Sequence, residues 1–424
     1  MTARSLCALA GLLGMYLPGS LAAQEPVRDS LLIRLTHEAL AANPGLAANR
    51  KSARAAAVRV RAAGALPDPM LETGVMNLTL PDFALRESDF TEVDVQLAQE
   101  FPWPGTLGAR TRRAEAEARM RSATAGMRAR DVAVRTAELY YRLRYVMAAR
   151  GTLGRQRVLL ETAVDVSTAR YASTAVPQSD PLQARVALAR LETEEAELAA
   201  QEAELRAGLK ALRNVAGADS LTVEPIRPDL VAPAAEQVHD SMAAVSDSAP
   251  DHPRIRAREA AVDAAERTAR VEQLGARPDF TVMARYGARP LGADFFSAFV
   301  GLRLPLWAGR KQHRLAEAAR IEADAARAEA EDERAALGAE IRTARAEVTA
   351  GARRLRLLTD RVVPAARATV EATLRTYRVG QVEFVTVLAT EDALYRAELD
   401  AARVAAEHLT HLVILEQLLA PEES

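Results

Sequence analysis

The chain has 424 residues and a formal net charge of −2, and 49% of its residues are apolar although only 4% are aromatic. A nearly neutral chain lacks the strongly basic character of a nucleic-acid-binding protein, so no nucleic-acid partner is expected. So few aromatic residues are unusual for a globular enzyme and favour long, alanine-rich helices.

Residues 1–23 have the pattern of a secretory signal peptide. Arg4 supplies a positive charge, an apolar run follows, and small residues up to Ala23 offer a cleavage site. The run is shorter than the roughly 20 residues that a transmembrane helix needs. Cys7, the only cysteine, lies in this segment, so no disulfide is expected in the mature chain. No later segment suits a spanning helix, and any membrane insertion is therefore expected to use β-strands.

An internal duplication, with an offset of roughly 200 residues, divides the sequence. Four pairs of matching signals occur in the same order in both halves. They are Asn43-Pro44 and His252-Pro253, Leu66-Pro67-Asp68 and Arg277-Pro278-Asp279, Phe101-Pro102-Trp103 and Leu304-Pro305-Leu306-Trp307, and the spacing of Tyr171 to Leu182 and of Tyr377 to Leu388.

Each half is predicted to contain a moderate helix, two strands, a very long helix and a second moderate helix. The helices are expected over 31–64, 105–172 and 181–215, and over 237–275, 309–376 and 383–420. These elements define a first structural repeat over 24–216, a linker over 217–236, a second repeat over 237–420 and a tail over 421–424. Pro364 lies inside the last long helix, where it is expected to kink the helix or to join two helices.

Heptad spacing in the long helices indicates coiled-coil packing along their length. The repeating positions are Leu139, Val146, Leu153 and Leu160, and Ile341, Val348, Leu355 and Val362. A helix of about 70 residues would extend roughly 105 Å, about as far as two of the moderate helices placed end to end. On these segments alone, a soluble coiled-coil rod is the better interpretation.

Four segments between the helices alternate apolar and polar residues, as strands do. They lie at about 70–80, 92–101, 279–287 and 296–304. Each is about as long as a tilted membrane-spanning strand. Trp103 and Trp307 follow the second strand of each pair, where an aromatic belt at a membrane interface is expected.

The predicted fold is mainly α with a small β part: a duplicated long-helix coiled-coil barrel with four transmembrane β-strands per protomer. Four strands cannot close a barrel, and open edges are not tolerated in lipid. A trimer would supply a 12-stranded barrel. The alternative is that the strands form two amphipathic hairpins packed on a soluble core.

Together these features resemble the TolC-like outer-membrane efflux family over nearly the whole chain, from about Leu31 to Ala420. The motifs that carry the resemblance are Leu35-Thr36-His37-Glu38-Ala39-Leu40 with Asn43-Pro44, then Pro67-Asp68 and Pro278-Asp279, and Tyr377-Arg378-Val379-Gly380 running on to Val387-Leu388. The resemblance implies a homotrimer in outer-membrane lipid that extends into the periplasm as a passive duct without cofactors. Its implied partners are a periplasmic adaptor protein and an inner-membrane pump, of the resistance-nodulation-division type.

Two proline-tryptophan segments, Phe101-Pro102-Trp103-Pro104-Gly105 and Leu304-Pro305-Leu306-Trp307-Ala308-Gly309, look most like the heavy-metal branch of this family, the CusC and CzcC type. The turns between paired helices look like the family's tunnel tips, where the adaptor binds and the tunnel closes. The candidate tip residues are Tyr171, Ser173, Asp180, Tyr377, Val379, Gly380 and Thr386. Thr386 and Ala389 stand where some members carry constricting acidic residues, which speaks against a carboxylate ring here.

No catalytic constellation is found, whether a phosphate loop, a nucleophile elbow or a metal-ligand cluster. His408 and His411 share a helix face but have no third ligand nearby, so no metal site is expected there. The chain is therefore not expected to be an enzyme. One competing interpretation is a periplasmic coiled-coil adaptor or scaffold without a pore, which would need a single helical hairpin flanked by β-rich modules, and the duplication argues against it. The other is a periplasmic enzyme on a helical scaffold.

Overall fold

The computed structural model describes residues 29–78, 81, 85–86, 88–172, 177–242, 252–379 and 381–419. The expected signal peptide, Ser173 and Gly380 lie outside the described residues. The chain divides into two compact units. Unit 1 comprises Met1–Ala41, Thr136–Val245 and Glu347–Thr410, and unit 2 comprises Ala42–Arg135, Ser246–Ala346 and His411–Ser424.

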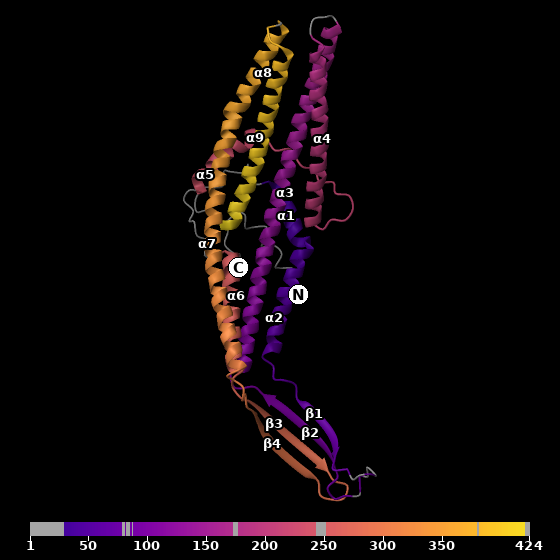
Figure 1. Ribbon diagram of the computed structural model, residues 1–424, viewed down its shortest axis with the longest axis vertical. Helices are drawn as coiled ribbons and strands as arrows, with labels where there is room; N and C mark the ends of the chain where they lie inside the picture. The colour runs from indigo at the N-terminus through magenta and orange to yellow at the C-terminus, as the bar shows by residue number, and fades with distance from the viewer. Residues whose placement is uncertain are drawn as a thin grey trace. The chain divides into compact units, whose positions relative to one another are not determined.

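Helices make up most of the described chain (Figure 1). They are α1 (Ser30–Ala42), α2 (Pro44–Ala63), α3 (Thr106–Ala172), α4 (Ser179–Leu212), α5 (Pro228–Met242), α6 (Pro253–Leu274), α7 (Gln312–Leu357), α8 (Val363–Arg378) and α9 (Phe384–Leu419). The prediction of a mainly helical chain with a small β part is confirmed. No helix in the described ranges is long and apolar enough to cross a membrane.

Three expected helices are interrupted in the structure. The helix expected over 31–64 breaks at Asn43, whose extended backbone caps α2 while Pro44 begins it. The helix expected over 237–275 is replaced by α5 and α6, because His252 and Pro253 repeat the same cap, and α5 begins inside the expected linker.

The third interruption is a π-helical turn, Leu358–Val362, between α7 and α8. Pro364 lacks a backbone donor and would crowd the carbonyl four residues earlier, and a widened turn at this point relieves both problems. The extra residue also shifts the heptad phase. Ile341, Val348 and Leu355 are buried as expected, whereas Val362 is exposed.

His252 caps α6 as a neutral acceptor, since its Nδ1 accepts the backbone N–H of Arg254 at 3.2 Å. Burial, and then the charges of Arg130 and Arg254, lower the pKa of His252 from 6.5 to about 4. Between these two pH values His252 is protonated in the unfolded chain but neutral in the folded chain. The stability that the neutral cap contributes is therefore lost as pH falls from 6.5 towards 4.

His252→Asn is expected to keep the cap and to flatten this acid loss of stability, because Asn43 performs the same role at α2 with its Oδ1 accepting from Leu46. The measurement is the urea midpoint at pH 7 and at pH 4.5. An unchanged difference between the two midpoints in the variant would contradict the role given to His252.

Four strands form one antiparallel sheet in the order β1-β2-β3-β4. They are β1 (Met70–Met76), β2 (Glu92–Phe101), β3 (Asp279–Ala288) and β4 (Phe295–Arg303). Three strands agree with the prediction to within one residue at each end, and β1 ends earlier than expected. The β2–β3 pairing joins the hairpins of the two sequence halves, with Leu97 opposite Ala284 at its centre.

Candidate functional site

Every charged residue of the four strands lies on one face of the sheet, here called the polar face. Side chains alternate between faces along a strand, and the register fixes which residues share a face. The charged residues of the polar face are Glu72, Glu92, Asp94, Glu100, Asp279, Arg285 and Arg303.

Cross-strand ion pairs hold the polar face together. Arg285 pairs with Glu92 and lies 3.4 Å from a carboxylate oxygen of Asp94. Arg303 Nη1 lies 2.8 Å from Glu100 Oε1. The contacts of Arg285 join β3 to β2, and the contact of Arg303 joins β4 to β2. Each arginine of the polar face therefore lies beside a carboxylate of another strand.

The opposite side, here called the apolar face, carries side chains that the described chain leaves uncovered. Its exposed residues include Leu71, Val75, Val93, Val95, Leu97, Phe101, Val282, Tyr286, Phe296, Val300 and Leu302. Val300, for example, is 78% exposed. The outer edges of β1 and β4 also have no partner strand in the described chain. An apolar face and two unpaired strand edges are unfavourable in contact with water, so this surface is suited to contact with lipid or another protein.

The two tryptophans of the expected belt lie in different surroundings. Trp103 stacks on Phe280 with ring centroids 5.7 Å apart, and its backbone N–H donates to Asp279 Oδ1 at 3.0 Å. Trp307 is 73% exposed. Trp103 therefore also fixes the start of β3, whereas Trp307 has a free ring.

At the candidate tips, one hydrophobic cluster joins both helical pairs of unit 1. Ala184 of α4 and Phe384 and Val387 of α9 are buried at its centre, with partly buried neighbours on α3 and α8. The rings of Phe384 and Tyr377 lie 5.7 Å apart. The two turns that the sequence duplication predicts are thus brought together by side chains from four helices.

The candidate tip residues are not all part of this cluster. Tyr377 packs against it, whereas Tyr171, Val379 and Thr386 are exposed. Asp180 lies in the first turn of α4, where a carboxylate is favoured by the helix dipole.

A buried acid close to this cluster was missed by the sequence analysis. Glu391 of α9 is only 7% exposed, and its Oε2 has no hydrogen-bond partner among the residues that the structure describes. One heptad further on, Glu398 accepts from Arg155 of α3 at 2.8 Å and from Arg367 of α8 at 3.0 Å. The heptad row of Phe384, Glu391 and Glu398 could have revealed it, because an acid at a core position stands out in such a row.

Burial, and after it the charge of Glu398, raise the pKa of Glu391 above 4.5. As pH rises above 4.5 the unfolded chain ionises first, so stability is lost until pH passes the raised folded-state pKa. Glu391→Gln is expected to raise stability at pH 7 by about 1 kcal/mol and to remove that loss. Denaturant midpoints at pH 4.5 and pH 7 test this, with Asp392→Asn, an exposed acid beside it, as the near-silent control.

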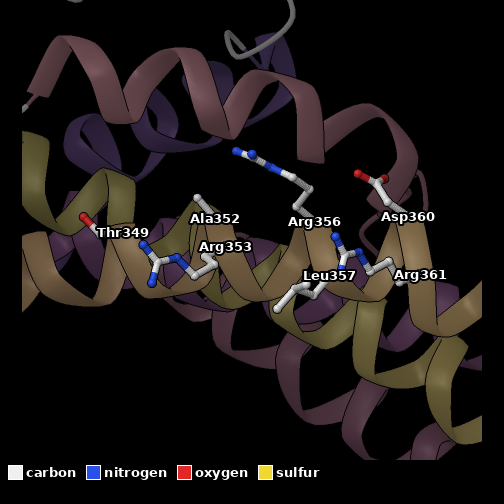
Figure 2. A pocket seen from close by; sticks show the side chains of 7 residues that line it. All are labelled: Thr349, Ala352, Arg353, Arg356, Leu357, Asp360 and Arg361. Atoms are coloured by element: carbon white, nitrogen blue, oxygen red, sulfur yellow. The ribbon is translucent and has the colours of Figure 1, made fainter.

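A cavity of about 450 Å³ lies along α7 and the π-helical turn, away from the tips (Figure 2). It is lined by Thr349, Ala352, Arg353, Arg356, Leu357, Asp360 and Arg361. Three guanidinium groups against one carboxylate disfavour cations. The described part of the chain holds no group of three or more His, Cys, Asp or Glu residues that could bind a metal ion.

The second half of the chain matches a known family. Residues 244–420 match the model of the family described as outer membrane efflux protein. No curated protein sequence matches the chain.

Solved outer-membrane channels share the fold. The outer-membrane channel OprN is 17% identical, with a TM-score of 0.77 over 94% of this chain and 91% of that one. CusC is 13% identical, with a TM-score of 0.78 and 93% of each chain covered. The outer membrane protein VceC of Vibrio cholerae is 17% identical, with a TM-score of 0.73 over 92% of this chain and 96% of that one. The fold is therefore that of these channels, and the second half of the chain is similar to the outer membrane efflux protein family.

Proposed function

We propose that three copies of this chain form a passive outer-membrane duct of a tripartite efflux system. The observation that carries the proposal is the sheet, which places every charged side chain on one face and uncovered apolar side chains on the other. A membrane barrel needs this division, with an apolar surface towards lipid and a polar surface towards its water-filled interior.

The open edges of β1 and β4 support an assembly of copies. A sheet edge in lipid leaves backbone groups unsatisfied, at a cost of several kcal/mol per group. Pairing β1 of one copy with β4 of the next removes both edges, and three copies would give a closed 12-stranded barrel. Trp103 and Trp307, which occupy equivalent positions in the two sequence repeats, would then lie at the membrane interface.

The helical tips would act as the periplasmic gate of this duct. In this proposal the shared cluster around Phe384, which packs the two helical pairs together, keeps the tip closed. An adaptor protein that binds the exposed residues Tyr171, Val379 and Thr386 better in an open arrangement would shift the population towards that arrangement. The inner-membrane pump, of the resistance-nodulation-division type, would supply the driving force.

The proposed cargo is small molecules or metal ions. The proline-tryptophan segments favour the heavy-metal branch, and CusC is among the proteins of similar fold. Sensitivity of a deletion strain to copper, zinc and cobalt salts, compared with its sensitivity to dyes and antibiotics, tests the cargo. Drug sensitivity without metal sensitivity would exclude the metal branch.

Fractionation tests the proposed location. The duct is expected to pellet with the outer membrane and to stay there after washing with high salt and carbonate. A periplasmic adaptor or scaffold without a pore would be released by the wash, and that result would overturn the proposal.

A further inference from the structure

The helices of unit 2 lie in the same order as the strands to which they connect (Figure 1). Gly64, at the end of α2, lies against Thr111 of α3. Arg119 of α3 pairs with Asp263 of α6 at 2.6 Å, and Arg327 of α7 pairs with Glu266 of α6 at 2.6 Å. The order is therefore α2, α3, α6 and α7, so α2 and α7 are the two edge helices, as β1 and β4 are the two edge strands.

The free side of α2 carries a basic row. The helix has five basic residues and no acidic residue. Arg54 and Arg61 are one heptad apart and exposed, and the described residues offer them no ion-pair partner. Val58, 68% exposed, lies between them, four residues after the first and three before the second. Helical geometry places all three on one face.

α7 carries an acidic row with the same spacing. Glu317 and Asp324 are one heptad apart, and Ile321, 63% exposed, lies between them at the same four- and three-residue intervals. Among the described residues, each acid pairs only with an arginine three residues away on its own helix, Arg314 or Arg327. Such exposed pairs are weak and leave the acids available to a partner.

The two rows match when the helices run antiparallel. α2 runs towards the sheet and α7 runs away from it, so Arg61 meets Glu317, Val58 meets Ile321 and Arg54 meets Asp324. Arg61 lies two residues before the end of α2, and Glu317 lies five residues after the start of α7. This difference of three residues is about 4.5 Å, which is less than one helical turn.

We propose that α2 of one copy packs antiparallel against α7 of the next, with Arg54 and Arg61 facing Asp324 and Glu317 across a contact of Val58 with Ile321. The inference rests on the proposed ring of copies and names the surfaces that form its helical seam. A coiled coil uses the same arrangement, in which flanking opposite charges select the partner and the register. A second copy fits this surface because the charge sign, the aliphatic position and the direction of the helices all match.

Disulfide trapping tests the seam in the full chain with Cys7→Ser. Val58→Cys together with Ile321→Cys is expected to give covalent dimers and trimers on mild oxidation of the membrane-extracted protein. Val58→Cys alone, and Val58→Cys with Ala328→Cys, which lies two turns further along α7, are expected to give none. Equal cross-linking of the two paired variants would overturn the proposed register.

Charge reversal tests the electrostatic part. Arg54→Glu with Arg61→Glu is expected to lower the trimer fraction about tenfold at low salt, since each seam then holds like charges. Adding Glu317→Arg and Asp324→Arg to the same chain is expected to restore trimers. Arg59→Glu with Glu322→Arg, on the same helices but off the two rows, is the matched control and is expected to leave trimers intact.

The outcomes separate the seam from the duct. Wild-type protein that extracts as a monomer would overturn the duct and the seam together. Wild-type trimers with neither the cross-link nor a charge-reversal effect would overturn the seam alone. Loss of trimers that acidic phospholipid restores, without rescue by the reversed α7 charges, would instead assign the basic row to lipid.

Discussion

Leu97→Arg is expected to abolish outer-membrane trimers, whereas Gln96→Arg is expected to leave them. Leu97 is on the apolar face at the middle of β2, opposite Leu71 and Ala284. An arginine that faces lipid near the bilayer centre destabilises the barrel by about 2–4 kcal/mol, and the proposed trimer would contain three of them. The measurement is the amount of heat-dissociable trimer in the outer-membrane fraction.

The neighbouring position provides the control because it differs only in the face it occupies. Gln96 donates to Glu72 Oε2 at 3.1 Å on the polar face, where an arginine gains a carboxylate partner. If the strands formed soluble hairpins with an exposed face, both variants would be tolerated. Normal trimer levels of Leu97→Arg would therefore contradict lipid contact of the apolar face.

Phe384→Ala is expected to open the tip. Phe384 is buried at the centre of the cluster that joins both helical pairs, and removing a buried phenylalanine costs about 3–5 kcal/mol. The loss falls on the contacts that we propose hold the tip closed, while the sheet of unit 2 is untouched. Single-channel recording is expected to show larger and more frequent openings, with trimer content unchanged.

Val385→Ala is the matched control for the tip. Val385 follows Phe384 on α9 but is exposed, so truncating it removes no buried contact. Its conductance is expected to equal that of the wild type. Equal conductance of Phe384→Ala and Val385→Ala would show that the cluster does not close the tip.

Much of the secondary structure could be predicted because its signals are local. The apolar alternation around Val95 locates β2, and the heptad from Leu139 to Leu160 locates α3, with each heptad position buried. The interruptions were harder to predict. One helix was expected to continue through Asn43 and Pro44, yet Asn43 ends one helix and begins another because its side chain accepts the N–H of Leu46.

The arrangement of the candidate site depends on contacts between residues far apart in the sequence. Periodicity placed Trp103 and Trp307 in equivalent positions, but the aromatic stack exists only where Phe280 of the other repeat pairs with β2. The cluster around Phe384 likewise needs α4 to lie beside α9. Such pairings depend on the tertiary fold, which local patterns do not specify.

The most direct test of the duct is electron microscopy of the detergent-extracted full chain. A three-fold particle is expected, with a barrel-sized cap and a helical tail on the order of 100 Å long. A monomer, or a simple rod without three-fold symmetry, would contradict the duct and favour the adaptor or scaffold.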